Sequence, residues 1–337
     1  MKMCVRRRVR RFLVILYLDR RIFRGNSEDA SFFVKGRKNM KKVMAVVLAV
    51  VMLAGCGSSG ASSASASASV PADAGSGISD AATGRLAEIK KRGVLTVATE
   101  PYWVPCEFID PSLSGDAQYV GSDIELAKYI AKKMNVALEI VPLEFTAVLS
   151  SIPEGKYDLA ISALAYTPER AEAMELSKGY YFTDDDEGYG ILTTEDLAPK
   201  ITSAADLADY TIVTQSGSLQ ELIVNQDVPA YKEFKRVSSM NDAYLAVQEG
   251  KADAAIVARS SAQLYIDNNP GSGLVVQDYK FELGEEYDGM RVGAKKGETD
   301  LIDYVNTCID ELLESGQYSQ WYDEYTEYAK KLGISEN

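Results

Sequence analysis

The 337-residue sequence contains no histidine. This absence excludes Ser-His-Asp and Cys-His catalysis and any zinc site that uses imidazole ligands. Cysteine is scarce as well, and the spacing of the four residues fits neither a metal knuckle nor a disulfide framework: Cys4, Cys56, Cys106 and Cys308. We therefore predict no catalytic residues, no metal site and no cofactor, and leave open whether Cys106 and Cys308 pair.

Basic residues are scarce beyond the first part of the chain. Residues 1–55 hold 14 of the 36 Lys and Arg residues and 3 of the 49 Asp and Glu residues, which leaves 22 basic and 46 acidic residues in 56–337. Such an acidic body repels phosphate backbones, so we expect no nucleic-acid partner. The length and the ordinary apolar share of 46% indicate a folded protein with room for two domains.

A short apolar run, residues 43–54, follows Lys41 and Lys42 and leads into Leu-Ala-Gly-Cys at 53–56. The run is too short to span a bilayer comfortably, so residues 40–55 are predicted to be a secretory signal. The four residues at its end resemble the lipobox of bacterial lipoproteins, which would make Cys56 the lipidated first residue of the mature protein. The alternative is a plain secreted protein with an incidental cysteine.

Residues 1–39 do not fit this signal and are interpreted as a misassigned upstream extension, with Met40 as the true start. Residues 56–84 are mainly Gly, Ser and Ala with scattered acids, which is typical of a flexible linker. Anchor and linker together would hold the folded body at the extracytoplasmic face of the cell membrane. A lipid anchor favours a Gram-positive cell surface, where no outer membrane retains a soluble protein.

Residues 157–170 join a buried strand to the start of a helix. The strand is predicted because Tyr157, Leu159, Ile161 and Leu164 lie among small residues with no break. Thr167 is suited to cap the following helix and Pro168 to its first position. Arg170 would then lie at the carboxyl end of a strand, where ligands bind in open α/β sheets. Taken alone, this pattern fits a carboxylate clamp and a surface ion pair equally well.

Strands and helices alternate along the rest of the chain, which indicates a sheet built from βαβ units. Ser122 and Glu125 form a candidate capping box before one helix, and Ser218 and Glu221 form another. Residues 99–105, rich in proline and aromatics, are predicted to be a loop. Gly217 would let backbone N–H groups converge on an anion.

Three segments carry a family resemblance: G-V-L-T-V-A-T-E-P-Y, then G-S-D-I-E-L-A-K-Y-I-A-K-K-M, then E-G-K-Y-D-L-A-I-S-A-L-A-Y-T-P-E-R-A-E. In this order they resemble the amino-acid-type solute-binding proteins of ABC importers, the bacterial extracellular solute-binding proteins of family 3, from about residue 86 onward. The resemblance implies an α/β, two-lobed periplasmic-binding-protein-like fold (type II) with two hinge crossings. It places lobe 1 at 85–184 and 289–337 and lobe 2 at 185–288, and it implies a monomer.

The resemblance also implies roles for individual residues. Arg170 would grip the ligand α-carboxylate, helped by backbone groups of Ala163 and Ala165 in lobe 1 and by Gly217 and Ser218 in lobe 2. Trp103 and Phe145 would be aromatic walls, and Glu100 would meet the ligand side chain. For the two aromatic residues, packing within the lobe is the alternative.

Three positions depart from the family pattern or extend it. Ala258 stands where the family usually has an Asp for the ligand ammonium, so either Glu100 or Asp242 substitutes or the ligand is not a simple α-amino acid. Ala165 stands where relatives often have a hydroxyl. Arg259 would either meet a second ligand carboxylate or begin a solvated helix.

The acidic stretch at 184–187 and the two cysteines of the folded body each have a functional and a purely structural interpretation. The acids at 184–187 face a cationic ligand or hold a cation, or they form a solvated loop. Cys106 and Cys308 are interpreted as buried packing residues, not as nucleophiles.

The expected function is capture of a polar amino acid or similar small carboxylate and its delivery to an ABC permease, without catalysis. One alternative is a dehydratase-type enzyme on the same fold, with Glu100 as the general acid or base. The other is a ligand-sensing surface lipoprotein with no transport role.

Overall fold

The computed structural model describes residues 84–182 and 188–334, all of which belong to one compact unit, 74–337. The predicted signal, Cys56, most of the linker and the acids at 184–187 lie outside the described residues. None of the described helices combines the length and the apolar character that a bilayer span requires.

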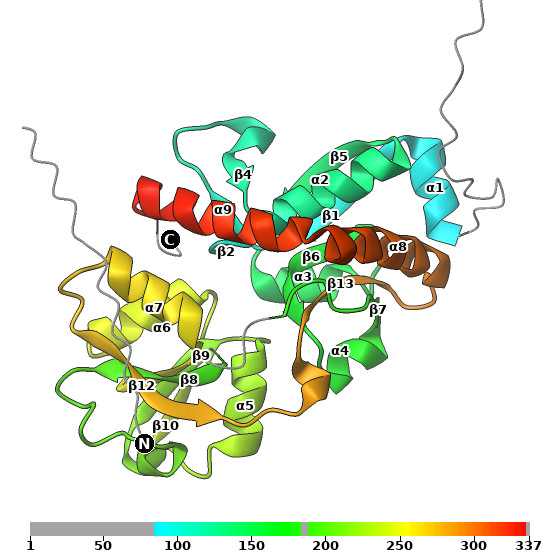
Figure 1. Ribbon diagram of the computed structural model, residues 1–337. Coiled ribbons are helices and arrows are strands. Elements are labelled where there is room, and N and C mark those ends of the chain that lie inside the picture. The colour runs from blue at the N-terminus through cyan, green and yellow to red at the C-terminus, as the bar shows by residue number, and fades with distance from the viewer. Residues whose placement is uncertain (1–83, 183–187, 335–337) are drawn as a thin grey trace, which may run out of the picture. The chain divides into compact units, whose positions relative to one another are not determined.

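The first lobe is built on a five-stranded sheet (Figure 1). Its strands are β1 (Val94–Thr99), β5 (Ala137–Pro142), β6 (Leu159–Ala165), β7 (Met174–Leu176) and β13 (Met290–Lys295). Its helices are α1 (Gly84–Arg92), α2 (Ser122–Met134), α3 (Phe145–Ser151), α4 (Pro168–Ala173), α8 (Thr299–Ser315) and α9 (Gln317–Leu332). The strand order is β5-β1-β6-β13-β7, in which β5, β1 and β6 are parallel and β13 runs antiparallel to its neighbours.

The second lobe is built on another five-stranded sheet. Its strands are β8 (Tyr189–Thr194), β9 (Thr211–Gln215), β10 (Glu233–Val237), β11 (Ala254–Ala258) and β12 (Leu274–Phe281). Its helices are the 3₁₀ helix η2 (Ala204–Asp209), α5 (Leu219–Asp227), α6 (Met240–Gln248) and α7 (Arg259–Asn268), and the 3₁₀ turn η3 (Glu285–Tyr287) precedes β13. The order is β10-β9-β11-β8-β12, with β8 antiparallel to both neighbours.

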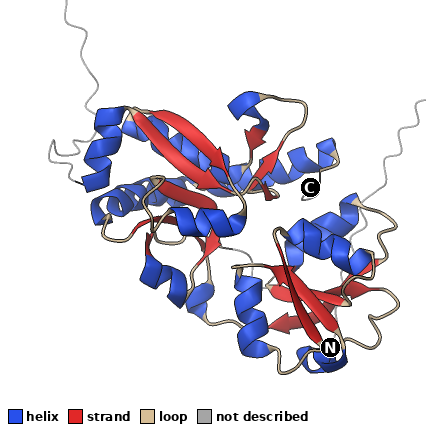
Figure 2. Cartoon of the chain, turned by 180° about the vertical axis from the view of Figure 1, so that it is seen from behind, coloured by secondary structure: helices blue, strands red, loops and turns tan. Residues whose placement is uncertain are grey.

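Helices cover both faces of each large sheet (Figure 2). In β6, Leu159 and Ile161 join the core under α2 and α8, whereas Ala160 and Leu164 join the core under α3. Strands buried on both faces have this near-continuous apolar sequence. The predicted mixed α/β architecture with parallel strands is therefore confirmed.

A small antiparallel sheet replaces the loop predicted at 99–105. It comprises β2 (Tyr102–Trp103), β3 (Glu107–Ile109) and β4 (Tyr119–Val120), with the 3₁₀ turn η1 (Gly115–Gln118) before β4. The loop prediction is wrong for 102–103, because the pairing partner of this segment, Glu107–Ile109, lies outside it in the sequence. The sheet packs through Phe108 and Val120 against Ala329 of α9.

The two strand–turn–helix signals differ in how well they predict local structure. Thr167 caps α4 by accepting a hydrogen bond from the Arg170 N–H at 3.1 Å, with Pro168 at the first helical position, as predicted. The strand before it begins at Leu159 and not at Tyr157. At α5, Ser218 accepts from the Glu221 N–H, but the Glu221 carboxylate accepts from Gly217 and not from Ser218, so only half of the predicted box forms.

The capping box predicted at Ser122 is wrong. The N-cap of α2 is Gly121, and the Ser122 hydroxyl is hydrogen-bonded to the Tyr318 hydroxyl at 2.9 Å. Gly121 has φ 130°, and a Cβ there would lie 2.1 Å from the Cys106 carbonyl oxygen. Only glycine permits this approach, which turns Asp123, at 0% exposure, into the lobe.

The chain passes between the two sheets twice, and the passing segments lie side by side. Tyr180 donates its N–H to the Met290 carbonyl at 2.8 Å, and Met290 donates to the Tyr181 carbonyl at 2.9 Å. Residues 180–181 follow β7, and Met290 begins β13. This paired connection is the arrangement in which hinge closure around a ligand occurs.

Candidate functional site

Residues from both lobes line one cavity of about 40 Å³. The first lobe contributes the carboxyl ends of β1 and β6 with the starts of α3 and α4, and the second lobe contributes the turn from β9 into α5. The lining includes seven of the predicted site residues: Glu100, Trp103, Phe145, Ala163, Ala165, Arg170 and Ser218. The space has room for only a few water molecules, so a larger ligand requires the lining groups to move apart.

Arg170 is buried in this lining, with 6% of its surface exposed. Its guanidinium donates to the Ala165 carbonyl at 2.7 Å and, across the lobes, to the Gly217 carbonyl at 2.8 Å. Among the described residues no salt bridge includes Arg170. Burial lowers the pKa of Arg170 to about 10. Within the described part of the chain the hydrogen bonds of this buried cation go to carbonyl groups and not to a carboxylate, which leaves it suited to an incoming anion.

Glu100 is an acidic group of the same lining, with 4% exposure. Its carboxylate accepts a 2.7 Å hydrogen bond from the side-chain amide of Gln215, which also reaches across the lobes. Burial raises the pKa of Glu100 to about 7, against the opposing effect of the Gln215 bond, and the negative charges of Glu144 and Asp242 act in the same direction as burial. A nearby cation would restore the charged form.

The two predicted aromatic walls have different packing. Phe145 begins α3, is 7% exposed and lies under Arg170, whose guanidinium carbon is 5.4 Å from the ring centroid. This cation–π contact helps to hold the arginine in place. Trp103 belongs to β2 of the first lobe but packs against the second-lobe core around Met240 and Tyr265. Both residues line the cavity and also pack against neighbouring side chains, so a role as aromatic wall and a role in packing are compatible.

The backbone at Ala163 is in the left-handed region, with φ 45°, in the middle of β6. A non-glycine residue there stores strain that its surroundings must hold. The Ala163 N–H donates to the buried Asp123 carboxylate at 2.8 Å. That N–H is therefore already satisfied, and the Ala165 carbonyl is satisfied by Arg170.

The predicted anion site at Gly217 is wrong in its detail. The Gly217 N–H donates to the Glu221 carboxylate at 2.7 Å, because Glu221 lies one helical turn further along and folds back over the turn. The Ser218 hydroxyl donates to the Gln215 carbonyl at 2.7 Å. Gly217 contributes its carbonyl to Arg170 instead, and Ser218 lines the cavity.

Comparison with known proteins decides the family. The family model for bacterial extracellular solute-binding proteins, family 3, matches residues 95–328. The chain belongs to this family. The arginine-binding extracellular protein ArtP of Bacillus subtilis (strain 168) is 28% identical over 228 residues, 66% of this chain and 82% of that protein. A probable histidine-binding protein of Campylobacter jejuni is 28% identical over 235 residues, 68% of this chain and 84% of that protein.

Solved structures agree with these relatives. The amino acid ABC transporter substrate-binding protein AbpA from Streptococcus pneumoniae, bound to L-arginine, is 31% identical with a TM-score of 0.64, covering 74% of this chain and 99% of that one. The fold of this solute-binding protein is therefore the two-lobed, type II periplasmic-binding-protein fold, as predicted. Its relatives are binding proteins of importers, and the chain captures a solute for import.

Three predicted positions of the solute-binding protein lie away from the cavity lining. Ala258 ends β11 and precedes α7 without lining the cavity. Arg259 begins α7, as one of its two interpretations predicted, and its guanidinium donates to the Gln277 and Tyr279 carbonyls of β12 instead of lining the cavity. Asp242 is exposed in the first turn of α6, and it acts on Glu100 only through its charge.

Some lining residues were not singled out from the sequence. They are Glu107, Ser162, Tyr189, Gln215, Leu219 and Gln220. For Gln215, the position at the carboxyl end of β9 was the available signal, since ligands meet strands there. Glu107 gave no such signal, because its strand pairs only with the short segments β2 and β4. Cys106 and Cys308 are both buried and free, as packing residues should be.

Proposed function

We propose that this solute-binding protein captures an amino acid with a cationic side chain and does not catalyse its conversion. In this proposal the ligand carboxylate meets Arg170, and a ligand cation, ammonium or guanidinium, meets Glu100. The observation that carries the proposal is the buried guanidinium of Arg170, which has no acidic partner among the described residues. A carboxylate would complete it with the bidentate geometry that arginine favours.

The acidic end of the cavity supports the cationic class of ligand. Glu100 lines the cavity, and its pKa is raised by the charges of Glu144, the residue before α3, and of Asp242 in α6. Position 258 is an alanine and offers no carboxylate to a ligand cation. The acids in the lining are Glu100 and Glu107, and the proposal assigns the contact with the ligand cation to Glu100. The names of the relatives, which include arginine-binding and histidine-binding proteins, point to the same class.

Titration calorimetry with three related compounds tests the function. L-Arginine should bind, whereas agmatine, which lacks the carboxylate, and citrulline, which lacks the side-chain charge, should each bind at least about tenfold more weakly, the effect of roughly 1.4 kcal/mol. Equal affinity for arginine and agmatine would contradict the role of Arg170. Equal affinity for arginine and citrulline would contradict only the cationic class.

Affinity for a cationic ligand should rise with pH around neutrality. Glu100 has a pKa of about 7 and is largely protonated at pH 6, so binding there must first remove a proton. When the ligand cation holds Glu100 ionised, affinity should rise about tenfold between pH 6 and pH 8 and then level off. Calorimetry at the two pH values measures this, and the Glu100→Gln variant should show a flat profile. A fall in affinity over the same interval would refute the Glu100 contact.

We propose that the protein is a monomeric lipoprotein of a Gram-positive cell surface, held by Cys56 at the outer face of the cell membrane, and that an ABC permease receives its ligand. The apolar run before Leu53-Ala54-Gly55-Cys56 supports this, and dual acylation gives stable anchoring. Expressed from Met40, the protein should sediment with membranes, and Cys56→Ser should release it into the medium. Membrane association that survives this substitution would refute the anchor.

A dehydratase is the second candidate, and one observation favours it. An ancestral amino acid-binding protein, described as a precursor of cyclohexadienyl dehydratase, is 28% identical to this chain with a TM-score of 0.61. The Glu100 pKa of about 7 would suit a general acid or base. Turnover of a prephenate-like substrate that Glu100→Gln abolishes would favour the enzyme over the binding protein.

A further inference from the structure

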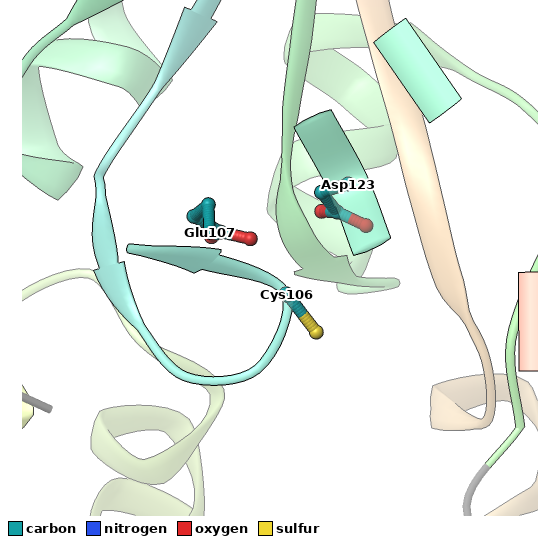
Figure 3. Close-up of side chains that lie close together, drawn as sticks. All are labelled: Cys106, Glu107 and Asp123. Carbon is teal, nitrogen blue, oxygen red and sulfur yellow. The ribbon is translucent and has the colours of Figure 1, made fainter. Parts of the chain in front are cut away.

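A buried group of three side chains lies beside the ligand cavity. Cys106, Glu107 and Asp123 each offer one atom that could bind a metal ion, and these atoms lie within 4.8 Å of one another (Figure 3). All three residues are fully buried. Glu107 also lines the cavity, so the group reaches the floor of the cavity through this residue.

The hydrogen bonds around the two acids are unequal. Asp123 accepts from the Tyr318 hydroxyl at 2.6 Å and from the Tyr180 hydroxyl and the Ala163 N–H at 2.8 Å each. Glu107 accepts from the Ser162 hydroxyl at 2.9 Å through Oε1, while its buried Oε2 has no hydrogen-bond partner, and the carboxyl group interacts with the neighbouring Asp123. Within the described part of the chain neither acid has a Lys or Arg partner.

Two adjacent carboxylates cannot both stay ionised in such a site without a cation. Burial raises the pKa of Asp123, but its three donors act in the opposite direction and favour its charged form over that of Glu107. We propose that Glu107 is a neutral carboxylic acid that donates its proton to Asp123, and that this acid pair positions the floor of the ligand cavity. Burial and the neighbouring charge of Asp123 raise the pKa of Glu107 well above its usual range, in agreement with the geometry.

The titratable groups that face Glu107 leave this assignment intact. Cys106 beside it is a thiol, because burial raises its pKa well above the ordinary value. Tyr180 and Tyr318 are neutral donors to Asp123, with pKa values raised well above normal by burial. Glu100, the other acid acting on Glu107, is linked to it only through Ser162 and raises its pKa further.

The acid pair connects the cavity to the hinge and to the last helix. On the cavity side, the Ser162 hydroxyl donates to Glu107 and accepts the Glu100 N–H at 3.0 Å. On the other side, Asp123 holds the strained backbone of Ala163, the crossing segment at Tyr180 and α9 at Tyr318. Glu107 is therefore a positioning residue: a second carboxylate charge there would repel Asp123 and loosen all of these attachments.

A pair of variants tests the proposal. Glu107→Gln can donate to Asp123 and accept from Ser162 without a titrating proton, so it should bind L-arginine within about twofold of wild type. Glu107→Ala should bind at least about tenfold more weakly. Equal losses in both variants would overturn the positioning role. If neither protein binds any ligand, the stability and infrared measurements below still decide the protonation state, so the proposal is separable from the proposed function.

The pH dependence of folding stability distinguishes a protonated Glu107 from a residue that is only structural. Since folded wild-type protein retains a proton that the unfolded chain releases above its ordinary carboxyl pKa, stability should fall as pH rises from 6 to 8. The unfolding equilibrium constant of each protein is measured as a function of pH. For each pH unit, the constant of the wild type should rise by about tenfold more than that of Glu107→Gln, because the wild type releases one additional proton on unfolding. Identical slopes would overturn the proposal.

Infrared spectroscopy of the wild-type protein keeps the test independent of whether a variant folds. At pH 8, where Glu100 is mostly ionised, a carbonyl band of a protonated carboxylic acid should remain, and selective carbon-13 labelling of glutamate should shift it. Absence of that band, or a metal ion found by elemental analysis in stoichiometric amount, would overturn the assignment of a proton.

Discussion

Replacing Arg170 with alanine should weaken binding of the amino-acid ligand by about 2–5 kcal/mol, the cost of removing one partner from a buried charged pair. This corresponds to roughly 30- to 4,000-fold in the dissociation constant. The loss is large because the ligand carboxylate would enter a small buried cavity where the carbonyls of Ala165 and Gly217, which repel it, had faced the guanidinium. Isothermal calorimetry with L-arginine measures it.

The folded, ligand-free variant should be as stable as the wild type or more so. Burial lowers the pKa of Arg170 to about 10, which means that the fold disfavours its charge. Thermal unfolding without ligand should therefore change little, while the stabilisation by added ligand should disappear. A lower unfolding temperature with an unchanged ligand response would indicate a structural arginine and contradict the clamp.

Two controls sharpen the result. Arg170→Lys keeps the charge but loses the planar fork, so it should recover only part of the affinity. Arg259→Ala removes a guanidinium that serves two carbonyls of β12 and does not line the cavity, so affinity should stay near that of the wild type. Near-wild-type affinity in Arg170→Ala itself would refute the carboxylate role.

Short-range signals in the sequence predicted the helix starts on which Arg170 and Ser218 depend. Thr167 and Pro168 act within one turn of Arg170, and Ser218 acts within one turn of Glu221. Each of these hydrogen bonds joins residues three positions apart, so it can be predicted from the local sequence without knowledge of the tertiary structure. The family resemblance then supplied the two-lobed fold, which no local pattern could have specified.

Contacts between residues distant in sequence account for what the sequence did not predict. The Gln215–Glu100 bond joins residues 115 positions apart, and Tyr318 reaches Asp123 across 195 positions. The capping box at Ser122 fails for this reason, because the hydroxyl is taken by Tyr318. The acid pair of Glu107 and Asp123 is likewise formed by packing β3 against α2, and neither residue carries a local signal.

Asp158 provides the largest expected loss of folding stability. It precedes β6, and its side chain is completely buried. It accepts hydrogen bonds from Arg85 at 2.6 Å, from Arg92, and from the N–H and hydroxyl of Thr96 at 2.8 Å each. Since the two arginines lie on α1 and Thr96 lies on β1, this one carboxylate joins the first helix to the sheet.

Asp158→Ala should lower the free energy of unfolding by about 3 kcal/mol, the lower end for breaking a buried ion pair, because both arginines are partly exposed and can rehydrate. The N–H and the hydroxyl of the half-buried Thr96 would lose the same acceptor. Urea denaturation, analysed for midpoint and slope, measures the change. The matched control is Glu88→Ala, which removes an exposed carboxylate 3.5 Å from the same Arg85 and should cost less than about 1 kcal/mol. Similar losses in the two variants would mean that Arg85, and not the buried Asp158, holds α1 to the sheet.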